Sequence, residues 1–439
     1  MNPVVNKTVT EIIDNEYKAY AMYVLENRAI PSYIDGFKPS HRKILYSMLN
    51  YYKGKKVKVA ELGTSISQFN YHHGETSAMG AAITLTANWN NNMPIFRGHG
   101  NFGTRLIQEA AAPRYIFADL NPDFYKYFND FEVCNKHIDL ENPEPQQYLP
   151  TIPWILVNGI EGIAVGFACK FLSHSTKDIA KACTLAVKNK LKDSYVLPVT
   201  LPGFKGEIIQ EDHNKIITRG IVERTKRNTW TITEVPWGYD REKFFNQLDK
   251  MLEQNKIVDF EDMCDESGFK FVVKMDTVTD AKCEKDPIEF FKLEKAFTEN
   301  YTALDENGRI ILFNNKLEII RRFVDFRIAK VGERIAYDIN KLSNDINWLT
   351  TKLSFVKDVV NKKINLLKFT RAELHETCMQ KYNIEKDIST KLLSIPVFDM
   401  TTDMIAELEA KIEKLNNDKN VLIESDPTEV YLAMLKTIS

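Results

Sequence analysis

The chain has 439 residues, of which 44% are hydrophobic and 27% are charged. This is the composition of a globular protein that can bury a sizeable core, and the length predicts about two to four domains. A formal net charge of −2 gives no overall attraction to nucleic acid, so any basic surface must be local. No apolar run is long enough to span a bilayer, and the first residues do not resemble a signal peptide, so we expect no membrane segment.

The six cysteines are scattered along the chain and include no CxxC pair. This argues against a zinc site and against a disulfide framework. It is typical of a protein from a reducing compartment, so we expect a cytoplasmic location.

The first third of the chain is predicted to be mainly helical. Residues 8–27 have helical periodicity, and Pro39 suits the first turn of a helix that continues to residue 52. Two further helices, over residues 59–69 and 75–89, are separated by a short turn that contains glycine. This is the outline of a helix-turn-helix, whose second helix enters a DNA major groove, although any helical hairpin has the same outline.

The middle third changes character and is predicted to be an α+β region. Residues 228–237, 269–275 and 308–314 are rich in β-forming residues, and residues 241–254 form a short amphipathic helix between them. Neither a GxxxxGK[ST] loop nor a GxGxxG fingerprint occurs, so the sequence carries no common nucleotide-phosphate motif.

The last third is dominated by long helices. Apolar residues recur in steps of three and four from Ile328 to Val360, and a second such stretch runs from Ile405 to Leu422. This spacing is typical of a coiled coil, and a long arm of this kind commonly holds two parts of a protein apart. The alternative is that the long helices simply pack against other helices. We predict two antiparallel arms joined by a small globular knob, and an arm of about 33 residues is about 50 Å long at 1.5 Å per residue.

Basic residues are concentrated in the first third, where acidic residues are sparse. They are Arg28, Lys38, His41, Arg42, Lys43, the run from Lys53 to Lys58, His72, His73, Arg97, His99, Arg105 and Arg114. A local basic concentration in a nearly neutral chain is the footprint of phosphate binding, and a solvated positive face is the alternative.

The stretch AAAPRYIF, residues 110–117, follows a glycine-rich run and contains the pair Arg114 and Tyr115. A phenol has a pKa near 10, so at neutral pH it is a weak nucleophile that needs help. A neighbouring guanidinium group favours the phenolate and neutralises charge on a phosphoryl transition state. From these residues alone, Tyr115 is either a half-buried aromatic or a reactive phenol.

Several motifs together resemble a known family. In chain order they are IDGFKPSHRKILYSM, YHHGETSAMG, RGHGNFGTR, AAPRYIF, ILVNGIEGIAVGFA, ITEVPW and DESGFKFVV. Their order and spacing resemble the breakage–reunion core of type II DNA topoisomerases, and the resemblance covers nearly the whole chain. The short chain resembles the medium subunit found in T-even-type bacteriophages.

The resemblance implies a multidomain α+β fold. It implies an N-terminal segment at 1–19, a winged-helix DNA-gate domain with the catalytic tyrosine at 20–145, and an α/β tower domain at 146–315. Antiparallel coiled-coil arms would fill 316–439, with a helical dimerisation knob at about 361–400.

The resemblance also implies roles for individual residues. Tyr115 would attack a DNA phosphodiester and hold the 5′ end as a phosphotyrosyl ester, helped by Arg114, Arg28 and His73. Expected DNA contacts are Lys38, His41, Arg42, Arg97, Arg105 and Ile163, the last as a wedge between base pairs. Taken alone, His73 could simply cap its turn, and Ile163 between glycines would ordinarily be a core residue.

The implied activity is transient double-strand cleavage and religation by a homodimer, with strand passage for relaxation and decatenation. No acidic metal-binding module and no ATP motif occurs, so we expect Mg²⁺ and ATP on partner subunits and no metal on this chain. No DNA-wrapping domain follows the second arm, so active supercoiling is not expected. If the protein is phage-encoded, its compartment is the host bacterial cytoplasm.

Two alternatives remain at the level of sequence. A recombinase or type IB enzyme would cut one strand at a time, without metal, and leave a 3′-phosphotyrosine. A non-enzymatic DNA-binding scaffold would combine the helix-turn-helix with the coiled coil and form no covalent product.

Overall fold

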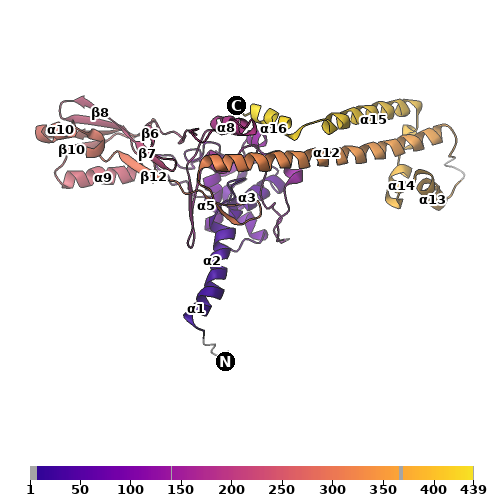
Figure 1. The fold of residues 1–439 in the computed structure, drawn as a ribbon, viewed down its shortest axis with the longest axis horizontal. Coiled ribbons are helices and arrows are strands. Elements are labelled where there is room, and N and C mark those ends of the chain that lie inside the picture. The colour runs from indigo at the N-terminus through magenta and orange to yellow at the C-terminus, as the bar shows by residue number, and fades with distance from the viewer. Residues whose placement is uncertain (1–6, 140, 365–368, 439) are drawn as a thin grey trace. The chain divides into compact units, whose positions relative to one another are not determined.

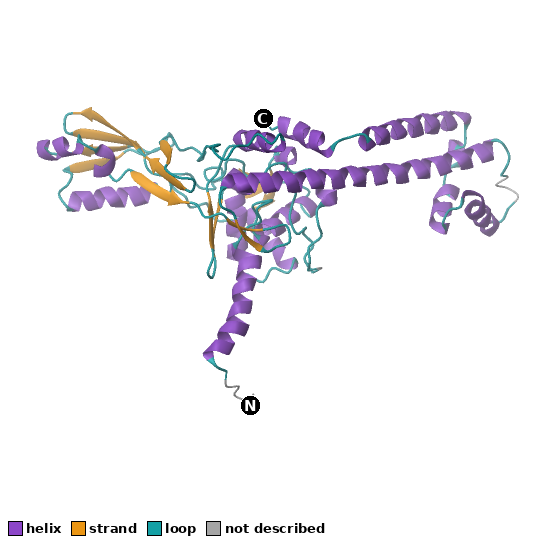
Figure 2. Ribbon diagram, in the orientation of Figure 1, coloured by secondary structure: helices purple, strands orange, loops and turns teal. Residues whose placement is uncertain are grey.

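The computed structural model describes residues 7–139, 141–364 and 369–438 (Figures 1 and 2). The start of the predicted N-terminal segment and residues 365–368 of the predicted knob lie outside the described residues. The chain forms two compact units, residues 1–327 with 432–439, and residues 328–431. The predicted mixture of helices and strands in an α+β fold is confirmed, whereas the boundaries at residues 145 and 315 stay predictions.

A long helix begins the described chain, as the periodicity of residues 8–27 predicts. Its turns alternate between α1 (Val9–Glu11), η1 (Ile12–Tyr17), α2 (Lys18–Val24) and η2 (Leu25–Ala29), where the two η segments are wider π-helical turns. Thr8 caps the start, and Ile30 leaves the helical region directly before Pro31, where the proline ring disfavours helix. Side chains are mostly exposed up to Tyr23, whereas Leu25, Ala29 and Ile30 are buried.

Three helices follow and pack on one another. They are α3 (Pro39–Asn50), α4 (Val59–Ser65), extended by the short η3 (Ile66–Gln68), and α5 (Glu75–Thr86). A Cβ on Gly63 would lie 2.7 Å from Met79 Cγ, so α4 and α5 approach closely only because residue 63 is glycine. The two helices of the predicted helix-turn-helix outline are therefore present.

A small antiparallel sheet completes this region. Its strands are β1 (Val57–Lys58), β3 (Phe117–Leu120) and β2 (Phe96–His99), in the order β1-β3-β2. The short helices α6 (Phe124–Tyr127), η4 (Phe131–Val133) and α7 (Ile155–Asn158) come next. After them, β4 (Ile160–Ile163) and β5 (Ala168–Phe171) form a hairpin, and α8 (Thr176–Val187) follows.

The predicted β-rich region forms separate sheets (Figure 2). One contains β12 (Glu294–Thr298), β7 (Lys215–Arg219) and β6 (Glu207–Gln210) in that order. Another contains β10 (Asp259–Asp262), β11 (Phe271–Lys274), β9 (Thr229–Glu234) and β8 (Ile221–Lys226). A two-stranded pair joins β13 (Thr302–Leu304) to β14 (Ile310–Leu312).

Helix α9 (Arg241–Glu253) covers the four-stranded sheet, as Figure 1 shows. Its buried Phe244 and Leu248 share one core with Trp230 and Ile232 of β9 and Phe271 of β11. Along β9 buried and more exposed residues alternate, which is the period of a strand with one face against the core. The short helices α10 (Thr277–Cys283) and α11 (Pro287–Phe290) complete this part.

Helix α12 (Lys316–Val360) contains the whole first apolar repeat of the sequence. All ten repeat positions from Ile328 to Val360 are buried or half-buried. The remaining helices are α13 (Arg371–Tyr382), α14 (Lys386–Leu393), the single turn η5 (Val397–Asp399), α15 (Thr402–Ile423) and α16 (Pro427–Lys436).

A small core lies where the knob is predicted. Phe355 at the end of α12, Cys378 of α13 and Leu392 of α14 are buried together. Lys357 of α12 and Glu409 of α15 form an ion pair at 2.5 Å, which places these two helices in contact. The two long helices are confirmed, and their coiled-coil packing stays a prediction.

Candidate functional site

The loop that carries Tyr115 is held by backbone hydrogen bonds. The Tyr115 N–H donates to the Ala112 carbonyl at 2.9 Å, which closes a turn with Pro113 at its second position. The first two N–H groups of α4 have no partner within their helix, and they donate to the carbonyls of Ile116 and Pro113 at 3.0 and 3.2 Å. The loop is therefore fixed on both sides, by α4 and by β3.

The side chain of Tyr115 projects from this turn. It is 69% exposed, far more than a packing residue of its size. The Arg114 guanidinium carbon lies 4.9 Å from the centre of the Tyr115 ring, a cation–π contact. A phenol held outward beside a cation can meet a large anionic substrate without any lid having to open.

Four other predicted site residues line one cavity of about 600 Å³. They are Arg28, Lys38, His41 and His73. Burial, together with the electrostatic influence of Arg28 and His72, lowers the pKa of His73, which favours the neutral imidazole at neutral pH. Burial with Lys38 and Arg42 lowers the pKa of His41 to about 3, so the positive charge of the cavity comes from its lysine and arginine side chains.

The predicted catalytic residues therefore fall into two groups. Arg114 and Tyr115 occupy the loop before β3, and neither lines the cavity that contains Arg28 and His73. Within the part of the chain that the structure describes, one protomer does not bring all four side chains into one pocket.

The side chain of Arg42 forms a buried ion pair. Its Nε and one terminal nitrogen donate to the two oxygens of Asp35 at 2.8 and 3.1 Å, and the same nitrogen donates to the Phe37 carbonyl. Asp35 is fully buried and also accepts from the backbone N–H groups of Phe37 and Tyr148. Arg42 thus fixes the turn from which α3 begins, and its expected contact with DNA stays a prediction.

Arg97 faces outward although it is paired. It donates two hydrogen bonds to Asp119 at 2.9 and 2.7 Å, across the register that joins β2 to β3. His99 lies 3.0 Å from the same carboxylate. The side chain of Arg97 is still 55% exposed, so part of the guanidinium group remains accessible.

Arg105 occupies an aromatic cage. The rings of Phe204, Trp237 and Phe269 lie 5.0–5.3 Å from its guanidinium carbon. It donates to both oxygens of Glu234 at 2.9 and 2.8 Å, and its side chain is only 12% exposed. Arg105 therefore anchors the glycine-rich run to the β-rich region, a role that the sequence did not reveal.

Ile163 lies at the tip of the hairpin β4–β5 and is 79% exposed, so it is not a core residue. The hairpin packs against the end of the first helix. The contact is so close that a Cβ on Gly162 would lie 2.2 Å from the Ala29 carbonyl oxygen. Lys38 donates to the Glu161 carbonyl at 2.9 Å. These contacts place the exposed isoleucine beside residues of the cavity that Arg28, Lys38, His41 and His73 line, which we call the basic cavity.

The sequence predicts α5 as the second helix of the helix-turn-helix outline, and the structure adds the character of its outer face. The outer face of this helix carries only short side chains, and Thr76, Ser77, Gly80 and Thr84 lie on it. An added Cβ on Gly80 would meet nothing within 4 Å. Such a slim polar face can lie close to another surface, and the spacing of these residues at three and four is the signal that would have found it.

The described residues contain no group of three or more His, Cys, Asp or Glu side chains that could hold a metal ion. Where Mg²⁺ and ATP bind therefore stays a prediction. Among the described helices none combines the length and apolar character needed to cross a membrane.

Residues 28–437 match the family model for the A subunits of DNA gyrase and topoisomerase IV. The chain belongs to this family. The match spans both compact units and contains every predicted site residue from Arg28 to Ile163. The predicted relationship to type II topoisomerases is thus confirmed.

Individual relatives of the chain agree with the family match. It is 37% identical to the DNA topoisomerase medium subunit of Enterobacteria phage T4, over 94% of this chain and 95% of that protein. It is 28% identical to the mitochondrial DNA topoisomerase 2 of Dictyostelium discoideum, over 98% of this chain but 35% of that protein. The DNA-binding, cleavage and re-ligation domain of Plasmodium falciparum topoisomerase II superposes with a TM-score of 0.88 at 26% identity, covering 97% of this chain and 63% of that one.

The hairpin contact predicts the effect of Gly162→Ala. The added methyl group would collide with the Ala29 carbonyl, so the hairpin must shift and stability should fall by about 2 kcal/mol. The urea midpoint of unfolding measures this loss. Gly80→Ala is the matched control, because its methyl group enters open space on a helix and should leave stability unchanged or slightly higher. Equal midpoints for the two variants would contradict the packing of the hairpin.

Asp119 predicts a dependence of stability on pH. Burial raises the pKa of this carboxyl group, but hydrogen bonds from Arg97 and His99 outweigh burial, so the pKa is lowered. A lowered pKa in the folded state means that Asp119 stabilises the fold above about pH 4 and that this contribution is lost as the pH falls further. The free energy of unfolding should therefore decline less steeply in acid for Asp119→Asn than for the wild type. The exposed Asp123→Asn should follow the wild-type curve, and an Asp119→Asn curve with the wild-type slope would refute the assignment.

Proposed function

We propose that this chain is the DNA-cleaving and religating subunit of a type II topoisomerase, acting as a homodimer. The observation that carries the proposal is the exposed Tyr115 on a fixed loop, with the Arg114 guanidinium beside its ring. Family membership supplies the reaction class, since the relatives are type II topoisomerases.

In the proposed reaction the Tyr115 oxygen attacks a backbone phosphorus atom. The bond from phosphorus to the 3′ oxygen breaks, which leaves a 5′-phosphotyrosyl ester and a free 3′ hydroxyl group. The phenolic proton passes to a base, for which the neutral His73 imidazole is suited, and the leaving 3′ oxygen takes up a proton from solvent. Religation is the reverse attack by the 3′ oxygen, so the ester conserves the energy of the cut bond and resealing needs no external input.

The cations have separate tasks in this proposal. Arg114 stabilises charge on the phosphoryl group from the side of the tyrosine, and Arg28 does so from the cavity. Lys38 and the accessible part of Arg97 contact the DNA backbone. Arg42 and Arg105 act through the loops that they hold, since both already bind buried carboxylates.

We infer that α3 to α5 with the sheet β1-β3-β2 act as a winged-helix DNA gate, with the slim face of α5 in a groove. The β-rich region would serve as the tower, and α12 with α15 as coiled-coil arms that end in a dimer contact. Ile163 would wedge between base pairs, which costs a few kcal/mol of unstacking and is offset by wider contact with bent DNA.

A second copy of the chain would complete the catalytic set. Tyr115 is exposed and does not line the cavity of Arg28 and His73, so a partner's tyrosine could enter that cavity. Two such composite sites would cut the two strands of one duplex. Mg²⁺ and ATP would be bound by further subunits, and if the protein is phage-encoded the complex would act in the host bacterial cytoplasm.

The nucleophile is tested by Tyr115→Phe. Together with the partner subunits and Mg²⁺, the wild type should form a protein–DNA adduct that detergent traps, and the variant should form at least about 10⁴-fold less. Arg114→Ala should retain the nucleophile but cleave about 10²–10³-fold more slowly. DNA binding at low salt, measured in parallel, should be nearly equal for all three proteins. Adduct formation by Tyr115→Phe would sink the proposal.

The composite site is tested with mixed dimers made from differently tagged chains. A dimer of Tyr115→Phe with Arg28→Ala keeps one intact site if tyrosine and arginine come from different chains, so it should nick one strand. A dimer of the wild type with the doubly substituted chain then has no intact site and should be nearly inactive. If the second dimer nicks and the first does not, each tyrosine uses its own Arg28 and the composite site is wrong.

A further inference from the structure

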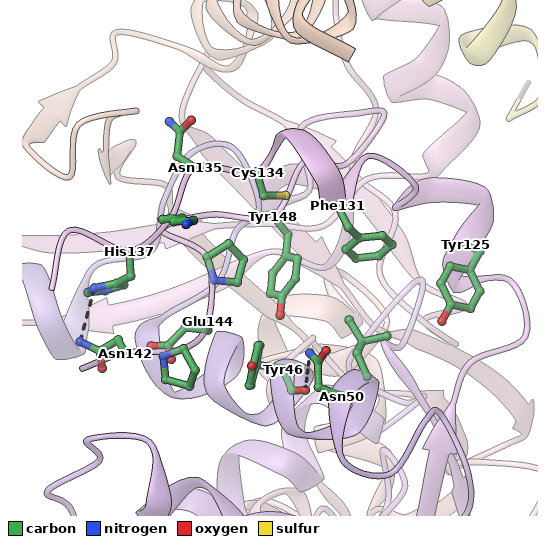
Figure 3. A pocket seen from close by; sticks show the side chains of 14 residues that line it. Tyr46, Asn50, Tyr125, Phe131, Cys134, Asn135, His137, Asn142, Glu144 and Tyr148 are labelled. Atoms are coloured by element: carbon green, nitrogen blue, oxygen red, sulfur yellow. Dashed lines mark hydrogen bonds between the residues drawn. The ribbon is translucent and has the colours of Figure 1, made fainter. Parts of the chain in front are cut away.

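A second cavity adjoins the cavity of Arg28 and His73, and His137, Asn142 and Glu144 line both. It has a volume of about 550 Å³ and lies between the C-terminal half of α3 and residues 125–148 (Figure 3). Its walls include four aromatic side chains, those of Tyr46, Tyr125, Phe131 and Tyr148. None of the predicted catalytic or DNA-binding residues lines it. This volume and lining are typical of a small-molecule site.

Two buried polar atoms in this cavity lack a hydrogen-bond partner among the described residues. They are the phenolic oxygen of Tyr148 and the Oε2 atom of Glu144. Each residue is only 2% exposed. Buried polar atoms without a partner are few in folded proteins, and each one requires an explanation. Two of them in the wall of one cavity indicate that a ligand supplies the missing hydrogen bonds.

The orientation of the two groups supports this explanation. In Figure 3 the phenol of Tyr148 points into the cavity toward Tyr46 and Asn50, and Glu144 lies to one side of it. Tyr148 is fixed at its other end, where its N–H donates to Asp35 at 3.0 Å and its ring packs edge-on against Phe131. The phenol is therefore aimed by the fold and is not free to turn away.

The chemistry of the two atoms defines the ligand. Burial raises the pKa of Tyr148 well above its usual value, so the phenol stays protonated and can donate. The other oxygen of Glu144 already forms an ion pair with Lys43 at 2.7 Å. Because Lys43 balances the negative charge of Glu144, the site favours a neutral ligand over a cationic one. What remains is an acceptor at Glu144, a donor at Tyr148, and aromatic walls.

We propose that this cavity binds a neutral, planar heteroaromatic molecule with an N–H donor next to an acceptor nitrogen. The N–H would donate to Glu144 Oε2, the acceptor nitrogen would receive the Tyr148 O–H, and the ring would pack against the aromatic side chains. This proposal is independent of the proposed DNA cleavage, because it requires neither DNA nor a partner subunit.

Three probes of similar size and shape test the proposal on the full wild-type chain by calorimetry and saturation-transfer NMR. Indazole carries both the donor and the neighbouring acceptor, indole lacks the acceptor, and N-methylindazole lacks the donor. Indazole should bind with a dissociation constant on the order of 1 mM or tighter, as expected for a ligand of this size. Indole should bind several-fold more weakly, and N-methylindazole at least about tenfold more weakly.

Tyr148→Phe ties the difference to the site. The removed hydroxyl group has no protein partner among the described residues, so the variant should fold with unchanged or slightly higher stability. It should bind indazole only as well as indole, and its affinity for indole should be unchanged. Tyr52→Phe, whose residue does not line the cavity, is the control and should behave as the wild type. Equal affinities of the three probes for the wild type, no binding of indazole at millimolar concentration, or an unchanged preference in Tyr148→Phe would each overturn the proposal.

Discussion

The buried ion pair between Arg42 and Asp35 is the constraint on which both cavities depend. Asp35 accepts hydrogen bonds from Arg42 of α3 and from the backbone of Tyr148, more than a hundred residues further along the chain. The first contact fixes the start of α3, where Lys38 and His41 line the basic cavity. The second fixes the residue whose phenol points into the aromatic cavity. A buried charge that loses its partner is strongly destabilising, so loss of this ion pair should disrupt both cavities.

The positive charges of the chain divide into two populations with different physical tasks. Arg42 and Arg105 lie against buried carboxylates and hold loops in place. Arg28 and Arg114 are exposed, and their side chains face solvent. A nearly neutral chain can thus present a strongly basic surface, because its carboxylates neutralise the structural arginines and leave the exposed ones available to an anionic substrate.

Local patterns in the sequence predicted the elements well. The apolar repeat from Ile328 to Val360 became one helix, and the β-rich residues 228–237 became a strand of the main sheet. These patterns succeed because they depend on neighbours within a turn or a strand.

Partners distant in the chain could not be predicted. The contacts of Arg105 with Glu234 and three aromatic rings are an example, because no local pattern links residues that far apart. The division of the catalytic residues into an exposed loop and a separate cavity was also invisible, since it depends on how the chain packs. The sequence thus predicts candidate residues, and only the structure shows which partners they contact.

The first helix has a practical consequence for handling the protein. From Val9 to Tyr23 it carries exposed apolar and aromatic side chains, among them Ile13, Tyr17 and Tyr20. A contiguous surface of this kind on a projecting helix is a common cause of self-association in concentrated solution. Colloidal behaviour, including loss on concentration and sensitivity to mild detergent, should therefore depend on these few turns more than on the net charge of the whole chain.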